Sequence, residues 1–226
     1  MVTWKVSLVL RSIMEMQDRI LQKSTDLFLS YGIRSITMDE IALQLGISKK
    51  TIYHYYEDKN ELVNAVILRI LDHNRNCCET YKTNSKNAIH EVFLAMEMIQ
   101  EMFDNMNPSL LYDLEKYHPV TFEKFNQYKH NFLSKVIRQN LEWGIKEELY
   151  REDINIGITT IIRLETMMLP FSASVFSRSK FNLAMVHQEL IEQYLFGLAT
   201  LKGYKLILKY KEERIKNKSH EGSEEN

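Results

Sequence analysis

Three signals for the start of a helix follow one another closely between residues 37 and 61, and they constrain the fold more than any other feature. Thr37 and Glu40 form a capping box, in which the Thr hydroxyl accepts from the Glu40 N–H and the Glu40 carboxylate reaches back. Gly46 ends that helix, because glycine readily adopts the left-handed C-terminal conformation. Ser48 and Asp58 can cap the next two helices. The sequence therefore predicts two short helices separated by a tight turn, followed by a long one.

The two short helices and the turn between them have the pattern of a helix-turn-helix. An amphipathic helix predicted from about Ser12 to Tyr31 precedes them, and Gly32 ends it. A short helical pair has several uses in proteins, of which DNA binding is one. The pattern by itself leaves that choice open.

The rest of the chain is predicted to be helical as well. Only 7 Gly and 3 Pro occur in 226 residues, and hydrophobic residues make up 45% of the chain. Few helix breakers and many Leu, Ile, Met, Lys and Glu residues favour an all-α fold. Asp153 is the candidate cap of a helix that stops near Pro170, and a last long helix is predicted from about Asn182 to Leu201. The predicted parts are an N-terminal extension (1–11), a helix-turn-helix domain with its connecting helix (12–82), a larger bundle (83–208) and a charged tail that frays from Lys209 (209–226).

The sequence shows neither a signal peptide nor a membrane span. The apolar run Val6–Leu10 is shorter than a signal-peptide core of roughly 7–15 residues, and Met14 or Met16 could equally be the start of translation. The adjacent Cys77 and Cys78 are not a disulfide framework and fit a reducing compartment. A cytoplasmic protein without metal or cofactor is therefore expected.

Residues suited to nucleic acid gather on the third predicted helix. Lysines and hydroxyl groups crowd its N-terminal turn, where unsatisfied backbone N–H groups already favour anions. Ile52 and Tyr56 are expected to face inward, and Tyr53 and His54 to project together from the outward side. Such lysines and tyrosines are usually ordinary surface or packing residues, and their joint position on a well-capped helix is what favours DNA contact. The candidate DNA-binding residues are Thr37, Ser48, Lys49, Lys50, Thr51, Tyr53, His54 and Lys59.

Residues 18–65 closely resemble the N-terminal signature of the tetracycline-repressor (TetR) family. The matching residues are Gly32, Thr37–Ala42, Leu45–Tyr53, Tyr55, Tyr56, Lys59 and Leu62, with Tyr56 in place of the usual Phe. The resemblance implies a transcriptional regulator, by default a repressor. It also implies phosphate contacts from Thr37, Tyr53 and Lys59, and base or phosphate contacts from Lys49, Lys50, Thr51 and His54.

The same resemblance implies that the bundle binds a small-molecule effector and forms a homodimer. The dimer would use helices at about 155–169 and 182–201, and the effector would release the protein from double-stranded operator DNA. A lipophilic effector is predicted, because Phe and Met residues are abundant on these helices. Ordinary core packing is the alternative for each of the candidate pocket residues, which are Phe93, Met96, Glu97, Phe103, Phe125, Phe132 and Met167.

Two other functions stay open. The chain could be an enzyme built on a helical bundle, although no Ser-His-Asp or Cys-His arrangement, metal motif or Gly-rich phosphate loop is visible. It could also be a scaffold that binds another protein and never contacts DNA. Charge reversal at Lys49 and Lys50 would separate these functions, since only a DNA reader depends on the two positive charges.

Overall fold

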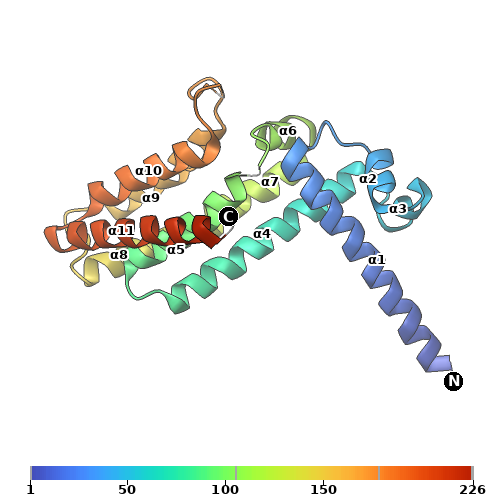
Figure 1. Ribbon diagram of the computed structural model, residues 1–226, viewed down its shortest axis with the longest axis horizontal. Coiled ribbons are helices and arrows are strands. Elements are labelled where there is room, and N and C mark those ends of the chain that lie inside the picture. Colours follow the sequence, from blue (N-terminus) through green and yellow to red (C-terminus); the bar gives the residue numbers. More distant parts are fainter. Residues whose placement is uncertain (1, 105, 178, 225–226) are drawn as a thin grey trace. The chain divides into compact units, whose positions relative to one another are not determined.

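The computed structural model describes the backbone of residues 2–224 except 105 and 178, and the side chains of residues 15–216 with the same exceptions. The described residues are mainly helical (Figure 1), and the all-α prediction is confirmed. The elements are α1 (Val2–Tyr31), α2 (Met38–Leu45), α3 (Lys49–Tyr55), α4 (Lys59–Asn84), α5 (Ala88–Asp104), α6 (Leu110–Tyr117), α7 (Pro119–Gln127), the π-helix η1 (Tyr128–Leu133), α8 (Ser134–Lys146), α9 (Ile156–Thr166), the 3-10 helix η2 (Leu169–Phe171), α10 (Leu183–Leu198) and α11 (Leu201–Glu224).

Three helix ends differ from the predictions. Helix α1 already begins at Val2, within the predicted extension, whose side chains up to residue 14 lie outside the described ones. Asn155, not Asp153, caps α9, because its side chain accepts from the N–H of Ile158 at 3.0 Å. The tail predicted to fray from Lys209 instead continues α11 to Glu224.

The chain forms two compact units that interleave along the sequence. Unit 1 comprises residues 1–74 and 105–126, and unit 2 comprises residues 75–104 and 127–226. Unit 1 therefore holds α1 to α3, the first part of α4, α6 and most of α7. The boundary that the sequence predicts at residues 82 and 83 stays a prediction.

In unit 1 the turn between α1 and α2 is held by two charged side chains. The Lys59 ammonium, at the start of α4, donates to the carbonyl of Ile33 at 2.6 Å. The Asp113 carboxylate, on α6, accepts from the N–H of the next residue, Arg34, at 3.0 Å. The turn itself requires Gly32, whose φ of 83° is in the left-handed region.

The core of unit 1 lies beneath the helix-turn-helix. Each of the first four helices contributes fully buried side chains, and burial of one such side chain stabilises the fold by roughly 1.5–3 kcal/mol. These side chains include Ile20 and Phe28 of α1, Ile41 of α2, Ile52 of α3 and Leu62 and Val63 of α4.

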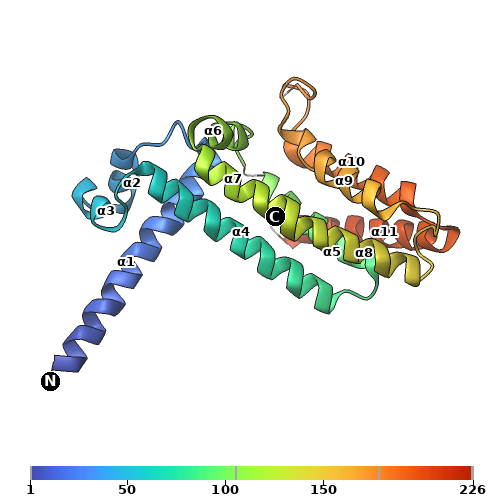
Figure 2. The same ribbon diagram turned by 180° about the vertical axis from the view of Figure 1, so that it is seen from behind.

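The core of unit 2 lies among helices that Figures 1 and 2 show side by side, namely α5, α8, α10 and α11. It contains a buried polar network in addition to apolar residues. The Tyr150 hydroxyl donates to Asn140 at 3.1 Å, and the Asn140 amide donates to the Glu91 carboxylate at 2.7 Å and to the Ala88 carbonyl at 2.8 Å. Burial raises the pKa of the Glu91 carboxyl.

Helix α9 has an unusual distribution of polarity. Its buried side carries Thr160, Arg163 and Leu164, whereas Ile158, Ile161 and Ile162 are 58%, 63% and 54% exposed. An arginine is therefore buried on the inner side of this helix, while three of its isoleucines are exposed.

Helix α11 packs within unit 2 through buried side chains and an ion pair. Tyr210 and Arg214 are 8% and 9% exposed, and the Lys211 ammonium pairs with the Glu192 carboxylate of α10 at 2.5 Å. These contacts explain why the helix continues through a segment whose composition is dominated by charge. Within the helices whose residues are described, none is long and apolar enough to cross a membrane.

We expect Gly32→Ala to lower the free energy of unfolding by about 2 kcal/mol or more, because a Cβ there is strained at positive φ and would lie 2.8 Å from the Ser109 hydroxyl. Gly46→Ala is the matched control, since Gly46 also has positive φ but no atom lies within 4 Å of the added Cβ. Urea denaturation of both variants measures the difference. Equal losses would contradict a close contact between α6 and this turn.

Candidate nucleic-acid interface

Helix α3 is fixed by a cap at its start and by two buried residues. The Ser48 side chain accepts from the N–H of Thr51 at 3.1 Å, as predicted. The helix ends at Tyr55. Ile52 is fully buried and Tyr56 is 3% exposed, which confirms their predicted inward orientation. The opposite side of the helix is consequently turned to the surface.

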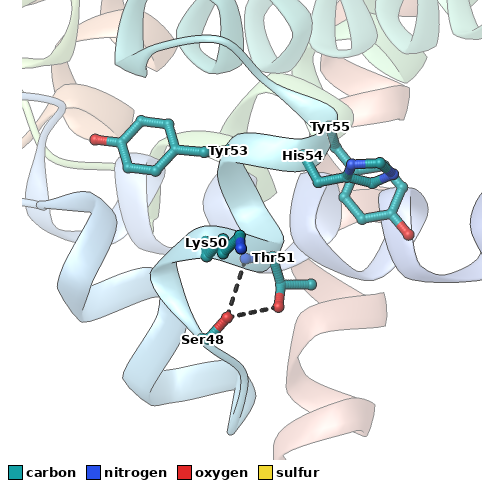
Figure 3. Close-up of a pocket in the computed structure, with 6 residues that line it drawn as sticks. All are labelled: Ser48, Lys50, Thr51, Tyr53, His54 and Tyr55. Carbon is teal, nitrogen blue, oxygen red and sulfur yellow. Dashed lines mark hydrogen bonds between the residues drawn. The ribbon is translucent and has the colours of Figure 1, made fainter.

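An open hollow of about 460 Å³ lies on this surface, and Figure 3 shows the residues around it. The capped first turn of α3 contributes Ser48 and Thr51 to the lining of the hollow, and the hydroxyls of these two residues are 2.8 Å apart. Tyr53 projects to one side of the helix, and His54 lies with Tyr55 on the other. The exposed side chains of Tyr53 and His54 thus point to different sides of the helix, whereas the sequence predicted that they project together. The lining residues are Ser48, Lys50, Thr51, Tyr53, His54 and Tyr55.

Of the two lysines in the first turn of α3, Lys49 is paired with a carboxylate of a described residue and Lys50 is not. The Lys49 ammonium donates to the Asp39 carboxylate of α2 at 2.7 Å, and this hydrogen bond raises the pKa of Lys49. Lys50 is exposed, and no hydrogen bond or ion pair joins its side chain to another described residue. Lys50 is therefore the lysine best placed to meet an anion directly. The partner Asp39 could not be found from sequence, because it is ten positions from Lys49.

Thr37 has the position that its capping box requires. Its hydroxyl accepts from the N–H of Glu40 at 3.1 Å, and the Glu40 carboxylate accepts from the N–H of Thr37 at 3.1 Å. The predicted box is confirmed. The Thr37 side chain is exposed at the start of α2, and a contact with DNA there stays a prediction.

Lys59 is more enclosed than the other candidate residues. Its ammonium is bonded to the Ile33 carbonyl and lies 5.9 Å from the centre of the Phe28 ring. Loss of hydration lowers the pKa of Lys59, and the nearby carboxylates of Asp113 and Glu40 oppose that shift. The structure thus gives Lys59 a role in holding the turn, and a phosphate contact stays a prediction.

The candidate pocket residues fall into several separate clusters. Phe93 and Met96 belong to the core of unit 2, where Phe93 lies 5.5 Å from the Tyr210 ring, and Phe103 packs edge-on against Phe171 at 5.3 Å. Phe132 lies under the Arg75 guanidinium at 4.7 Å.

The remaining three are less enclosed. Glu97 is exposed and Met167 is half-buried. Phe125 is stacked on Phe122 in unit 1. The role of the seven residues as a pocket stays a prediction.

Residues 20–66 match the family described as bacterial regulatory proteins, tetR family. This segment contains the capping box, the turn and the whole of α3. The helix-turn-helix segment of this chain is therefore similar to the tetR family. The two cysteines, Cys77 and Cys78, lie beyond the matched segment and are free thiols, and burial raises the pKa of Cys78 to about 11.

A curated relative is similar over a longer stretch than the family model covers. The HTH-type transcriptional regulator YvaF of Bacillus subtilis (strain 168) is 33% identical over 104 residues. The aligned part is 46% of this chain and 54% of YvaF, so the chain spans about half the length of this relative.

Solved structures resemble this chain over most of its length. A TetR-family regulator from Agrobacterium tumefaciens superimposes with a TM-score of 0.69 at 16% identity, covering 83% of this chain and 100% of the other. The regulator FadR from Bacillus subtilis, in complex with stearoyl-CoA, gives a TM-score of 0.62 at 16% identity and covers 80% and 98%. At these identities the likeness establishes the fold.

We expect Lys59→Ala to lower the free energy of unfolding by about 1–2 kcal/mol, because the Ile33 carbonyl loses a charged donor. Lys50→Ala should change it by less than about 0.5 kcal/mol, since Lys50 is exposed. Urea denaturation of the two variants provides the measurement. If both variants unfolded at the same urea concentration as the parent, Lys59 would not hold the turn.

Proposed function

We propose that this chain is a sequence-specific transcriptional regulator, by default a repressor, that binds operator DNA as a homodimer. The observation that carries the proposal is the capped, outward-facing helix α3 within the segment that matches the tetR family. Lys50, Thr51 and His54 lie on the exposed surface of that helix, where they can reach base edges or phosphates. The predicted cytoplasmic location agrees with this function and stays a prediction.

The first turn of α3 has the chemistry of a phosphate and base reader. The helix N-terminus favours anions, and the lysine ammonium groups add attraction that depends on salt. Asp39 partly neutralises Lys49 in the free protein. DNA binding therefore involves a competition between a phosphate and the Asp39 carboxylate for the same ammonium group.

A homodimer is supported by the exposed isoleucines of α9. Ile158, Ile161 and Ile162 are adjacent on one side of the helix and are more than half exposed in the single chain. Contiguous apolar surface of this kind is typical of protein–protein contacts. Helix α10 contributes less, because its apolar residues are mostly buried and Met185 is its exposed large hydrophobic residue. Two reading heads on one dimer would contact half-sites about 34–36 Å apart.

A small-molecule effector is proposed to bind unit 2 and to release the DNA. The chain passes from unit 2 to unit 1 and back through α6, whose Asp113 holds the turn before α2. A shift of α5 or η1 upon ligand binding would thus be passed along the chain to the reading head. The complex of FadR from Bacillus subtilis with stearoyl-CoA, a structure of similar fold, supports this proposal. A lipophilic effector stays our expectation.

The enzyme and scaffold alternatives have less support. The chain's relatives are transcriptional regulators, and neither alternative explains why exposed cationic and hydroxyl groups gather on α3. Both predict that substitutions at Lys50 leave any DNA affinity unchanged. The same DNA-binding measurement therefore tests all three functions.

We expect Lys50→Ala to weaken binding to the chain's own promoter region by about 1–3 kcal/mol and to change its preference among half-sites, as expected for loss of a base contact. Lys135→Ala, which removes an exposed lysine of α8, is the matched control. Asp39→Asn should strengthen binding at low salt, since it frees Lys49. Gel shifts over a salt series and selection from randomised half-sites measure these effects. If the parent does not bind duplex DNA, the proposed function is wrong; equal effects of both lysine substitutions would exclude Lys50 as a reader.

We expect the double substitution Ile158→Glu and Ile161→Glu to convert a dimer into a monomer. Both side chains are exposed in the single chain, so their replacement should cost little folding stability but would place charges in the dimer contact. Val120→Glu, at a position that is 75% exposed in unit 1, is the control. Light scattering coupled to size exclusion gives the mass. An unchanged dimer would show that the contact lies elsewhere.

A further inference from the structure

Three buried polar side chains come together inside unit 2. Arg163 of α9, His187 of α10 and Arg214 of α11 are 6%, 2% and 9% exposed. None of them was a candidate in the sequence, because a lone charged residue in an apolar helix gives no indication of the side on which it lies.

Their neighbours place them in the same part of the bundle. The Arg163 guanidinium lies 5.3 Å from the centre of the Tyr194 ring, two turns from His187 on α10. The His187 ring is edge-on to Phe103 of α5 at 5.3 Å. Arg214 contacts the same helix α5, where it donates to the Gln100 side chain and, at 3.5 Å, to the Met96 sulfur.

Part of the hydrogen-bonding capacity of this cluster is unused. Nη1 of Arg163, Nε of Arg214 and both ring nitrogens of His187 are buried and have no hydrogen-bond partner. The ion pairs among the described residues do not include Arg163 or Arg214. Buried cations are normally paired, since an unpaired charge loses its hydration without compensation.

Contacts within the protein satisfy only part of this requirement. The Tyr194 ring face offers Arg163 a cation–π contact, and Gln100 accepts one Arg214 hydrogen bond. Neither contact supplies the negative charge that two buried guanidinium groups lack. A purely structural role would be served better by an apolar side chain of similar size.

The protonation states leave the cluster cationic. Burial, together with the charges of Arg163 and Arg214, lowers the pKa of His187 to about 3, so its ring is neutral near pH 7. Burial lowers the pKa of Arg163 to about 10, which still leaves it charged. A neutral imidazole adds no repulsion and offers one donor and one acceptor.

We infer that Arg163 and Arg214 bind the acidic head group, a carboxylate or a phosphate, of an apolar small molecule, with His187 as a further hydrogen-bonding group. Guanidinium groups bind both kinds of anion through paired N–H donors. The aromatic rings of Phe103 and Phe171, which contact each other beside His187, provide apolar surface for the rest of the molecule. This inference rests on the effector site proposed above and names the chemistry of its ligand.

The test compares three probes that share a ten-carbon chain: decanoate and decyl phosphate, each below its critical micelle concentration, and decanol below its solubility limit. Calorimetric titration of the full chain, without DNA, gives the dissociation constants. We expect decanoate or decyl phosphate to bind at least about tenfold more tightly than decanol, and the better of the two identifies the head group. Equal affinity for all three probes, or no binding of either acid, would overturn the inference.

Variants then locate the site. Arg163→Met should weaken binding of the acidic probe by about tenfold or more, whereas Arg138→Met, at an exposed arginine of α8, should not. The ligand-free Arg163→Met protein should melt at the same or a higher temperature, because an unpaired buried charge is removed. A lower melting temperature with unchanged probe affinity would show that Arg163 is structural and would overturn the inference. His187→Phe provides a second variant should Arg163→Met fail to fold.

Gel shifts with the bound probe separate this inference from the proposed function. An acidic probe that binds through Arg163 but leaves DNA binding unchanged would support the head-group site and contradict its role as an effector site. Failure of the chain to bind DNA would contradict the proposed function alone, since the titrations contain no DNA.

Discussion

The turn between α1 and α2 is the point on which the geometry of unit 1 depends. Two consecutive residues of this turn are bound by opposite charges, the Ile33 carbonyl by the Lys59 ammonium and the Arg34 N–H by the Asp113 carboxylate. The nearby negative charge of Asp113 also opposes the lowering of the Lys59 pKa by burial. These two hydrogen bonds thus connect the start of α4 and helix α6 to the entry of the helix-turn-helix.

The parts of the fold that depend on local chemistry could be predicted from sequence. The cap at Thr37, the left-handed Gly46 and the cap at Ser48 each involve neighbours within a few positions, and the structure has all of them. The inward orientation of Ile52 and Tyr56 follows from the same helical period. For this reason the caps and the turn of the helix-turn-helix could be predicted from sequence, whereas the contacts of its surface with DNA stay a prediction.

Features that depend on distant neighbours were missed. Lys59 looks like an exposed cation in sequence, but its partner is a carbonyl twenty-six positions earlier. The sequence gives no indication that α9 buries Arg163 and exposes three isoleucines, because the choice of the buried side depends on the helices packed against it. Likewise the charged segment after Lys209 stays helical because Tyr210 and Arg214 reach the core of unit 2, which no local pattern indicates.

The interleaving of the two units has a consequence for recombination with related proteins. The segment that matches the family ends at residue 66, yet α6, which lies about forty positions later, supplies the Asp113 that holds the head's first turn. A chimera joined once after α4 would therefore pair one protein's head with another's α6. Such a hybrid would keep helix α3 of this chain. The N–H of Arg34 would lose its carboxylate acceptor unless α6 of the other protein carries an acidic residue at the position of Asp113. An exchange of residues 1–74 together with 105–126 transfers the complete unit.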